Sequence, residues 1–411
     1  MSENKMIAIQ CAVKKYHWGK KGSQSIIAQY IKNQNADFDV DENAAYAELW
    51  MGTHPSGPAL VAGPDPALVN HPLSSILHKS PEFVGNSELI AKYGANMPFL
   101  FKVLSVEQPL SIQTHPDKEL AKLLHEKDPL NYPDNNHKPE MAIALSAFDA
   151  LLSFRPIDEI RNNLQNIPEL RALIGENNIS VLIDAKSETI KDALQSCFSS
   201  LMNAPKELVE ANLKVLSERI DTAENISDPN LKSVFNKVYS YYPKDIGCFS
   251  IFFLNAIQLQ PYEAIFLPPN EPHAYLFGDC IECMACSDNV IRAGLTPKYK
   301  DVQTLCNSLT YDCKCADDLI LKPKQIDKFV SIYKPDVDEF AVEVIRVYIE
   351  DKQYELKTKE SGSFLIVLEG NGSMDNDLKL FPGFTCFIPA LTKAEIISVK
   401  ENLILCRSYC P

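Results

Sequence analysis

The stretch Pro98–Leu145 reads PFLFKVLSVEQPLSIQTHPDKELAKLLHEKDPLNYPDNNHKPEMAIAL. It begins with an apolar run, Phe99–Leu104, whose length and composition predict a β-strand. A second strand is expected at the segment SIQTH, because the proline that follows it ends strand pairing. Side chains alternate along a strand, so Ser111, Gln113 and His115 are expected to share one face.

The second half of this stretch adds a helix and another polar pair. Asp117 is suited to cap a short helix that runs through His125, whose leucines are spaced for one apolar face. After a polar loop, Lys138 and Glu140 stand two residues apart and share a face if the chain is extended. With one more nitrogen, the amide, imidazole and carboxylate of this stretch would form a set suited to zinc. A lone histidine or glutamate is more often a surface or hydrogen-bonded residue, so spacing alone leaves both readings open.

Several blocks of the chain resemble, in the same order, segments of the type I mannose-6-phosphate isomerases, also called phosphomannose isomerases. The most specific are SIQTHPDK at 111–118 and HKPEMAIAL at 137–145. The others are Tyr16–Gly22, Tyr46–Ser56, Pro98–Ser105, Asn270–Tyr275 and Glu282–Lys298. Together the blocks cover most of residues 10–150 and 245–305, whereas the middle and the C-terminal hundred residues match in character only.

The resemblance implies one zinc ion per chain, held by Gln113, His115, Glu140 and His273. His273 supplies the missing nitrogen, and two imidazoles, one carboxylate and one carbonyl oxygen suit zinc. The alternative is that His273 only ends the turn after Pro272.

The resemblance also implies interconversion of mannose 6-phosphate and fructose 6-phosphate through a cis-enediol, which supplies mannose for GDP-mannose and glycan synthesis. The expected catalytic residues are Arg292, Glu282 and Lys298. The guanidinium of Arg292 would neutralise an enediolate, and Glu282 or a zinc-bound water would carry the proton. Lysines and hydroxyls suit phosphate and sugar oxygens, and the expected substrate-binding residues are Ser111, Lys138, Lys298, Tyr275, Glu48, Trp18 and Lys102. For the last three, core packing or salt bridges remain the alternative.

The strand and helix patterns predict a mainly β protein with an all-α insertion: two cupin-like jelly rolls, each a double-stranded β-helix, plus a helical domain. The expected domains are a discontinuous catalytic jelly roll at 1–153 and 246–325, a helical insertion at 154–245 and a C-terminal jelly roll at 326–411. Strands are expected at Gly247–Leu254, Ala264–Pro268, Ala341–Tyr348, Ser363–Glu369, Gly383–Pro389 and Ala394–Val399. The C-terminal roll has no histidine and is expected to be metal-free.

Composition narrows the class of protein further. The 411 residues carry a net charge of −14, which argues against nucleic-acid and anionic-membrane surfaces. No signal peptide and no apolar run of about 18 residues is evident. The twelve cysteines are therefore expected to be reduced thiols. We expect a cytoplasmic monomer whose partner is a small sugar phosphate.

Cys280, Cys283 and Cys286 have the C-x-x-C-x-x-C spacing of an iron–sulfur or second zinc site. In a strand Cys283 would face away from the other two, so no metal role is expected. Two other functions stay open. A non-catalytic cupin that binds or senses a sugar phosphate would be expected to lack a ligand or Arg292. A cupin iron oxygenase would want two histidines and a carboxylate with several open positions.

Overall fold

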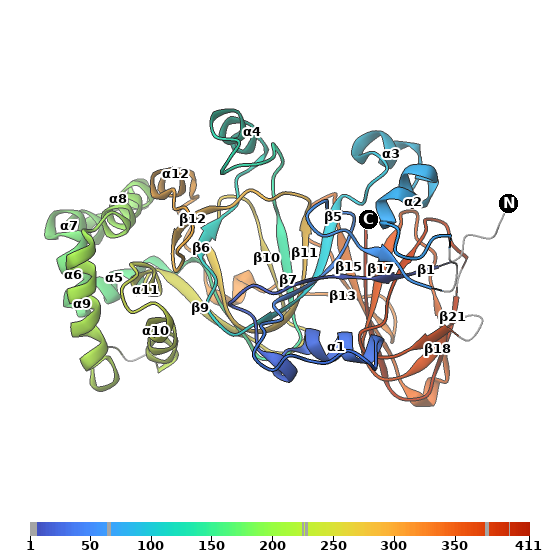
Figure 1. The fold of residues 1–411 in the computed structure, drawn as a ribbon. Coiled ribbons are helices and arrows are strands. Elements are labelled where there is room, and N and C mark those ends of the chain that lie inside the picture. Colours follow the sequence, from blue (N-terminus) through green and yellow to red (C-terminus); the bar gives the residue numbers. More distant parts are fainter. Residues whose placement is uncertain (1–5, 64–66, 224–225, 227–228, 375–377, 394) are drawn as a thin grey trace.

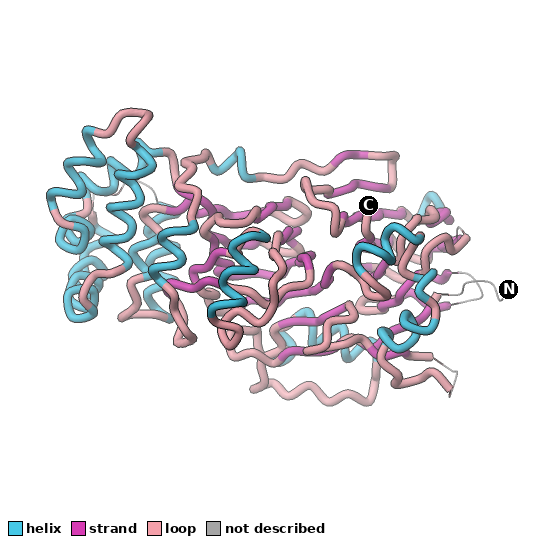
Figure 2. The backbone as a smooth tube through the Cα atoms, turned by 90° about the horizontal axis from the view of Figure 1, so that it is seen from above, coloured by secondary structure: helices cyan, strands magenta, loops and turns pink. Residues whose placement is uncertain are grey.

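The computed structural model describes residues 6–63, 67–223, 226, 229–374, 378–393 and 395–411. Figure 1 shows a helical region at one end, a strand-rich body in the middle and the C-terminal strands at the other end. The view from above in Figure 2 shows the same order. The predicted fold class, two cupin-like jelly rolls with a helical insertion, is confirmed by this arrangement of antiparallel sheets and helices. Among the described residues, no helix is long and apolar enough to cross a membrane.

The first jelly roll is organised around one long strand, β11 (His273–Ala285). Its first half pairs with β6 (Ile112–Thr114) and β8 (Phe148–Phe154). Its second half pairs with β5 (Phe99–Val106) and β7 (Glu140–Ala144). One strand therefore joins the sequence-distant segments that carry the expected site residues.

A bulge just after Tyr275 interrupts β11. Gly278 follows it with φ of 114°, a conformation that a side chain would strain. Because an extra residue reverses the alternation of side chains, Glu282 and Met284 face the same interior as His273 and Tyr275. The bulge thus aims both halves of β11 into one site.

The remaining elements of this roll frame its sheets. The strands are β2 (Ala12–Lys14), β3 (Glu48–Met51), β9 (Leu254–Leu259), β10 (Ala264–Leu267) and β12 (Ile291–Gly294). The helices are α1 (Ile26–Gln34), α2 (Leu73–Lys79), α3 (Ser87–Tyr93), α4 (Lys118–Lys127) and α12 (Val302–Ser308). The predicted cap of α4 is confirmed, since Asp117 accepts a hydrogen bond from the Leu120 amide at 2.9 Å. The helix ends two residues later than expected.

The insertion is helical, as predicted, and its apolar stripes pack into one core with the neighbouring end of the first roll. Its helices are α5 (Ile157–Asn166), α6 (Pro168–Ile174), α7 (Glu176–Asp184), α8 (Ile190–Met202), α9 (Lys206–Arg219) and α10 (Pro229–Tyr241).

The strand predicted at Gly247–Leu254 is wrong for most of its length. A short helix, α11 (Gly247–Ser250), occupies its start, and β9 begins only at Leu254. Phe249, Ile251, Phe252 and Phe253 are all buried. Because this segment is buried on every side, its apolar run lacks the alternation that separates a strand from a helix.

The C-terminal roll contains an eight-stranded and a four-stranded sheet. The strands of the first are β13 (Lys324–Gln325), β14 (Val330–Tyr333), β15 (Ala341–Val347), β22 (Leu403–Tyr409), β17 (Ser363–Glu369), β20 (Thr385–Ile388), β1 (Ile7–Gln10) and β4 (Leu60–Val61), in that order. Those of the second are β16 (Gln353–Leu356), β21 (Glu395–Val399), β18 (Gly372–Met374) and β19 (Leu378–Leu380). Of the strand expected at 394–399, Ala394 lies outside the described residues.

The domain boundaries given above stay a prediction, and the strand pairing adds one fact to them. β1 pairs with β20, so residues 7–10, expected in the first roll, extend a sheet of the second. The N-terminal segment therefore joins the two rolls.

Candidate active site

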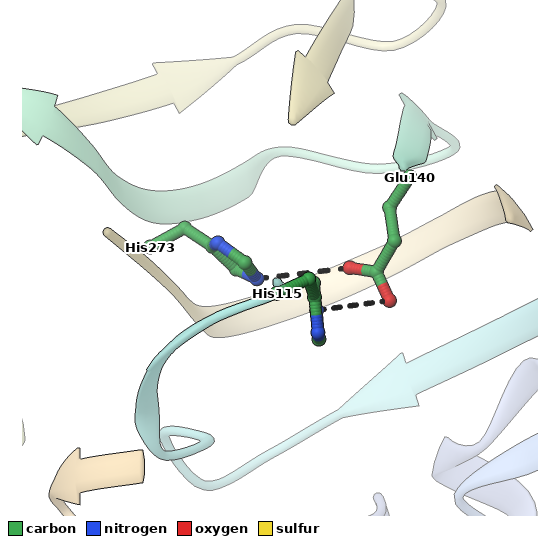
Figure 3. Close-up of side chains that lie close together, drawn as sticks. All are labelled: His115, Glu140 and His273. Atoms are coloured by element: carbon green, nitrogen blue, oxygen red, sulfur yellow. Dashed lines mark ion pairs between the residues drawn. The ribbon is translucent and has the colours of Figure 1, made fainter. Parts of the chain in front are cut away.

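Three buried side chains converge inside the first roll (Figure 3). His115 follows β6, Glu140 begins β7 and His273 begins β11. One Glu140 oxygen lies 3.3 Å from His115 Nε2, and the other lies 3.7 Å from His273 Nε2. Each residue is 1% exposed, and their candidate ligand atoms all lie within 4.8 Å of one another.

The hydrogen bonds of this cluster leave its inner atoms free. His115 Nδ1 lies 2.8 Å from the carbonyl oxygen of Asn289, and His273 Nδ1 lies 3.1 Å from that of Glu271. A carbonyl only accepts, so Nδ1 carries the proton in each ring and Nε2 presents a lone pair. Across the described chain, neither Nε2 atom nor Glu140 Oε2 has a hydrogen-bond partner. Buried polar atoms are rarely left unsatisfied, and this donor set fits a divalent metal ion.

The electrostatics of the cluster agree with this reading. Burial lowers the pKa of His273 to about 4, and burial also lowers the pKa of His115. Both rings are therefore neutral near pH 7, which is the form that binds a metal. Burial alone would raise the pKa of Glu140, but His115 and Lys138 outweigh it and hold that pKa well below its usual range. The Lys138 ammonium lies 3.2 Å from the carboxylate.

Gln113 lies on the same face as this cluster. It is the register partner of His273 on β11 and of Arg292 on β12. Its side-chain oxygen accepts a hydrogen bond from the Ser111 hydroxyl at 3.3 Å. Its role as a fourth ligand remains a prediction.

A cavity of about 210 Å³ opens beside the cluster. Its lining includes every predicted site residue except His115 and His273: Trp18, Glu48, Lys102, Ser111, Gln113, Lys138, Glu140, Tyr275, Glu282, Arg292 and Lys298. Residues from both halves of the discontinuous roll thus meet in one space.

One wall of the cavity holds a buried charge network. Lys102 Nζ lies 2.6 Å from a Glu282 oxygen and 3.7 Å from a Glu48 oxygen, and the Trp50 indole donates to the same Glu48 oxygen. Burial raises the pKa of Glu282 to about 7, against the opposing charge of Lys102. A carboxyl with that pKa can both take and return a proton near neutral pH.

Another part of the cavity lining is positively charged. Arg292 and Lys298 both line the cavity, and neither has an ion-pair partner among the residues that the structure describes. Burial lowers the pKa of Arg292, and burial together with the charge of Arg292 lowers that of Lys298. Two neighbouring cations that lack ion-pair partners in the described structure could together hold an anion.

Comparison with known proteins agrees with the site. Residues 6–157 match the catalytic domain of type I phosphomannose isomerase, and residues 173–254 match its helical insertion domain. The chain is 40% identical to the mannose-6-phosphate isomerase of Homo sapiens over the full length of both. The chain belongs to the type I phosphomannose isomerase family. The resemblance noted in the sequence is therefore confirmed, and the chain is an isomerase.

Solved structures of phosphomannose isomerases have the same fold. The apo form from Salmonella typhimurium matches with a TM-score of 0.83 and 30% identity, covering 100% of both chains. A mannose 6-phosphate isomerase bound with zinc and yttrium matches with a TM-score of 0.84 and 30% identity, over 98% of this chain and 99% of that one.

Several residues of this phosphomannose isomerase site are not predicted from the sequence. Asn289 and Glu271 orient the two histidines through backbone carbonyls, which no side-chain motif reveals. Trp50 lies in a block that resembles the family, so it could have been found. Tyr242 follows the last helix of the insertion and also lines the cavity. Further lining residues not predicted are Tyr16, His17, Asp288 and Thr296.

The cysteine motif lies beside this site. Cys280 packs in the core with Tyr275, whereas Cys283 packs in a different core on the other face of β11. Cys286 follows the end of the strand. The predicted opposite facing of Cys280 and Cys283 is confirmed, and the three thiols do not converge.

Proposed function

We propose that this isomerase interconverts mannose 6-phosphate and fructose 6-phosphate through a cis-enediol, with one zinc ion held by Gln113, His115, Glu140 and His273. The observation that carries the metal assignment is the set of three buried, converging atoms that lack hydrogen-bond partners. Two imidazoles and a carboxylate suit zinc, and a relative in the family is bound with zinc. When bound, the zinc supplies Lewis-acid polarisation of sugar oxygens.

The proton transfer is assigned to Glu282. Its pKa of about 7 makes its carboxylate a base that can take a proton at C2 of the aldose and return it at C1, while the hydroxyl proton passes from O2 to O1. Lys102, hydrogen-bonded to Glu282 at 2.6 Å, fixes the orientation of this carboxylate. Glu48 holds the same lysine from its other side, with a 3.7 Å ion pair, and therefore belongs to the wall rather than to the reacting groups.

The binding of the sugar phosphate is assigned to the remaining lining residues. Arg292 balances the negative charge that develops on the enediolate oxygens. Lys298 and Ser111 bind the phosphate and neighbouring oxygens. Burial raises the pKa of Tyr275 well above its usual value, and its hydroxyl has no partner in the described structure. It therefore stays a neutral donor for a sugar hydroxyl.

Lys138 and Trp18 complete the proposed site. Lys138 holds Glu140 in the ligand geometry through its 3.2 Å contact and offers its other hydrogens to the sugar. Trp18 gives the sugar ring an apolar wall.

The wider role is proposed with the reaction. Mannose 6-phosphate would feed GDP-mannose and glycan synthesis in the cytoplasm, a reducing compartment that suits twelve cysteines. We further propose that the chain acts as a monomer on a small sugar phosphate, without nucleic-acid or membrane partners, in line with its net charge of −14.

The test is coupled turnover of mannose 6-phosphate to fructose 6-phosphate by the purified chain, with and without a chelator, together with metal analysis. Activity that the chelator removes and zinc restores supports the proposal, and iron in the active protein would contradict the zinc assignment. Activity that persists after verified metal removal would discard the zinc mechanism. A folded, zinc-loaded chain without turnover would favour a non-catalytic sugar-phosphate-binding cupin.

A further inference from the structure

The segment 242–246 links the helical insertion back to the first roll. It lies between α10 and α11, and α11 packs against β12; Figure 1 shows α10 and α11 at the junction of the two regions. The Tyr242 hydroxyl donates to the carbonyl of Pro109 at 2.9 Å, just before Ser111 in the cavity wall. This segment therefore touches the active site although it belongs to the end of the insertion.

Asp245 connects the same segment to a second wall of the cavity. One carboxylate oxygen accepts hydrogen bonds from the amides of Gly247 and Leu295, both at 2.8 Å. The other oxygen lies 2.8 Å from Lys300 Nζ. The carboxylate thus holds both ends of the loop 295–300, and Lys298 lies between them.

The backbone at Gly247 and Gly294 packs closely below this carboxylate and leaves no room for a side chain on either residue. A Cβ atom on Gly294 would come within 2.9 Å of the Gly247 Cα atom and 3.0 Å of an Asp245 oxygen. Leu295 has φ of 53° and is 1% exposed, so its amide has no access to water as a substitute acceptor. Without the Asp245 carboxylate, this buried amide would lose its hydrogen-bond partner.

We propose that Asp245 is a positioning residue for the isomerase reaction, which holds the loop 295–300 so that Lys298 faces the phosphate of the sugar. This inference rests on the proposed role of Lys298. It gives the helical insertion a task in substrate binding. Because the phosphate does not react, loss of this positioning weakens binding of substrate and transition state alike, so KM should change and kcat should not.

The experiment compares steady-state kinetics of Asp245→Ala and Asp245→Asn with the unmodified, zinc-loaded enzyme. We expect Asp245→Ala to raise KM for mannose 6-phosphate about tenfold with kcat changed less than about threefold. The amide oxygen of Asp245→Asn still accepts from Leu295, so its KM should stay within about threefold of the unmodified value.

Glu169 offers a matched control inside the same insertion. It is 4% exposed and accepts a hydrogen bond from Arg219 Nε at 2.8 Å, and it does not line the cavity. Glu169→Ala should lower the unfolding temperature of the protein and leave KM unchanged. A KM increase as large as that of Asp245→Ala would show a general effect of a weakened insertion and overturn the inference.

Other outcomes separate the two proposals. If the unmodified enzyme lacks mannose 6-phosphate turnover, the proposed function fails. If it turns over and Asp245→Ala has an unchanged KM, or loses kcat alone, only the positioning inference fails. Should Asp245→Ala not fold, Lys300→Met removes just the ion pair of the loop and should raise KM about two- to threefold. An unchanged KM in that variant would also overturn the inference.

Discussion

One cluster in each jelly roll buries polar atoms, and the two clusters differ in whether the protein satisfies those atoms. In the first, His115, Glu140 and His273 point polar atoms at one another that have no hydrogen-bond partner in the described structure. Leaving a buried polar atom unsatisfied costs about 1–3 kcal/mol, so this arrangement is stable only if something else binds there. The interior of the first roll is therefore built to be completed by a ligand.

In the second roll the buried charges are satisfied by the protein itself. Arg407, 2% exposed on β22, donates to the Ser363 hydroxyl at 2.9 Å and to the Lys357 carbonyl. Glu343, its register partner on β15, is paired with Lys359. The comparison teaches that a buried polar cluster indicates a bound ligand where its atoms lack hydrogen-bond partners, and that the same architecture supports both uses.

The largest effect should come from the cluster of His115, Glu140 and His273 in the first roll. We call it the open cluster because its inner atoms lack hydrogen-bond partners in the described structure. Glu140→Gln keeps the shape of the side chain but removes the negative charge between the two histidines. We expect loss of bound zinc and a fall in turnover of about a thousandfold or more, or about 4 kcal/mol of transition-state stabilisation. Metal analysis and turnover of the same sample measure both. A variant that keeps zinc and turnover would refute the ligand assignment.

A substitution in the second roll's cluster of Arg407, Glu343 and Lys359 should lower the stability of the protein and leave its turnover unchanged. Arg407→Met deletes the cation next to Glu343 and leaves the Ser363 hydroxyl without its donor. We expect the free energy of unfolding, measured by chemical denaturation, to fall by about 3 kcal/mol. Turnover and zinc content per folded molecule should be unchanged. A turnover loss without destabilisation would mean that the second roll takes part in the chemistry.

A smaller effect is expected on the pH dependence of kcat/KM. The carboxyl of Glu282 has a pKa raised to about 7 by burial, which Lys102 counteracts. If the ionised carboxylate is the base, kcat/KM should rise as the pH increases through about 7 and then level off. Lys102→Met removes the counteracting charge, so the pKa should rise and the acidic limb should move up by about one unit or more. An acidic limb that stays in place would assign the titration to another group.

Local chemistry made much of the fold predictable. Strand alternation placed Gln113 on the face of the cluster of His115, Glu140 and His273, and the carboxylate of Asp117 capped α4 as expected. The strand predicted at Gly247–Leu254 is wrong because a segment buried on all sides has no alternation of apolar and polar residues that would separate a strand from a helix. The pairing of β1 with β20 joins Ile7 to Phe387, and no local pattern encodes a contact of that range.

The site itself was predictable only in part. Resemblance to the family, not spacing, selected His273, because its partner strand lies far away in sequence. The bulge after Tyr275 decides that Glu282 faces the cavity, yet its only trace in the sequence is a nearby glycine. Carbonyl groups such as that of Asn289 depend on loop conformation and not on residue type.

The smallest effect is expected for Cys283, which tests whether a buried thiol on β11 binds the proposed zinc ion. Cys283 is fully buried on β11 but faces a separate core, so its sulfur only packs. Cys283→Ala should lower the free energy of unfolding by about 1 kcal/mol through a small cavity. Zinc should remain at one ion per chain, and turnover should stay within about twofold of the unmodified value. The substitution leaves the proposed ligand atoms of His115, Glu140 and His273 unchanged. Loss of metal in this variant would show that the open cluster of the first roll extends to its thiols, and the contrast between the two rolls would then need a different basis.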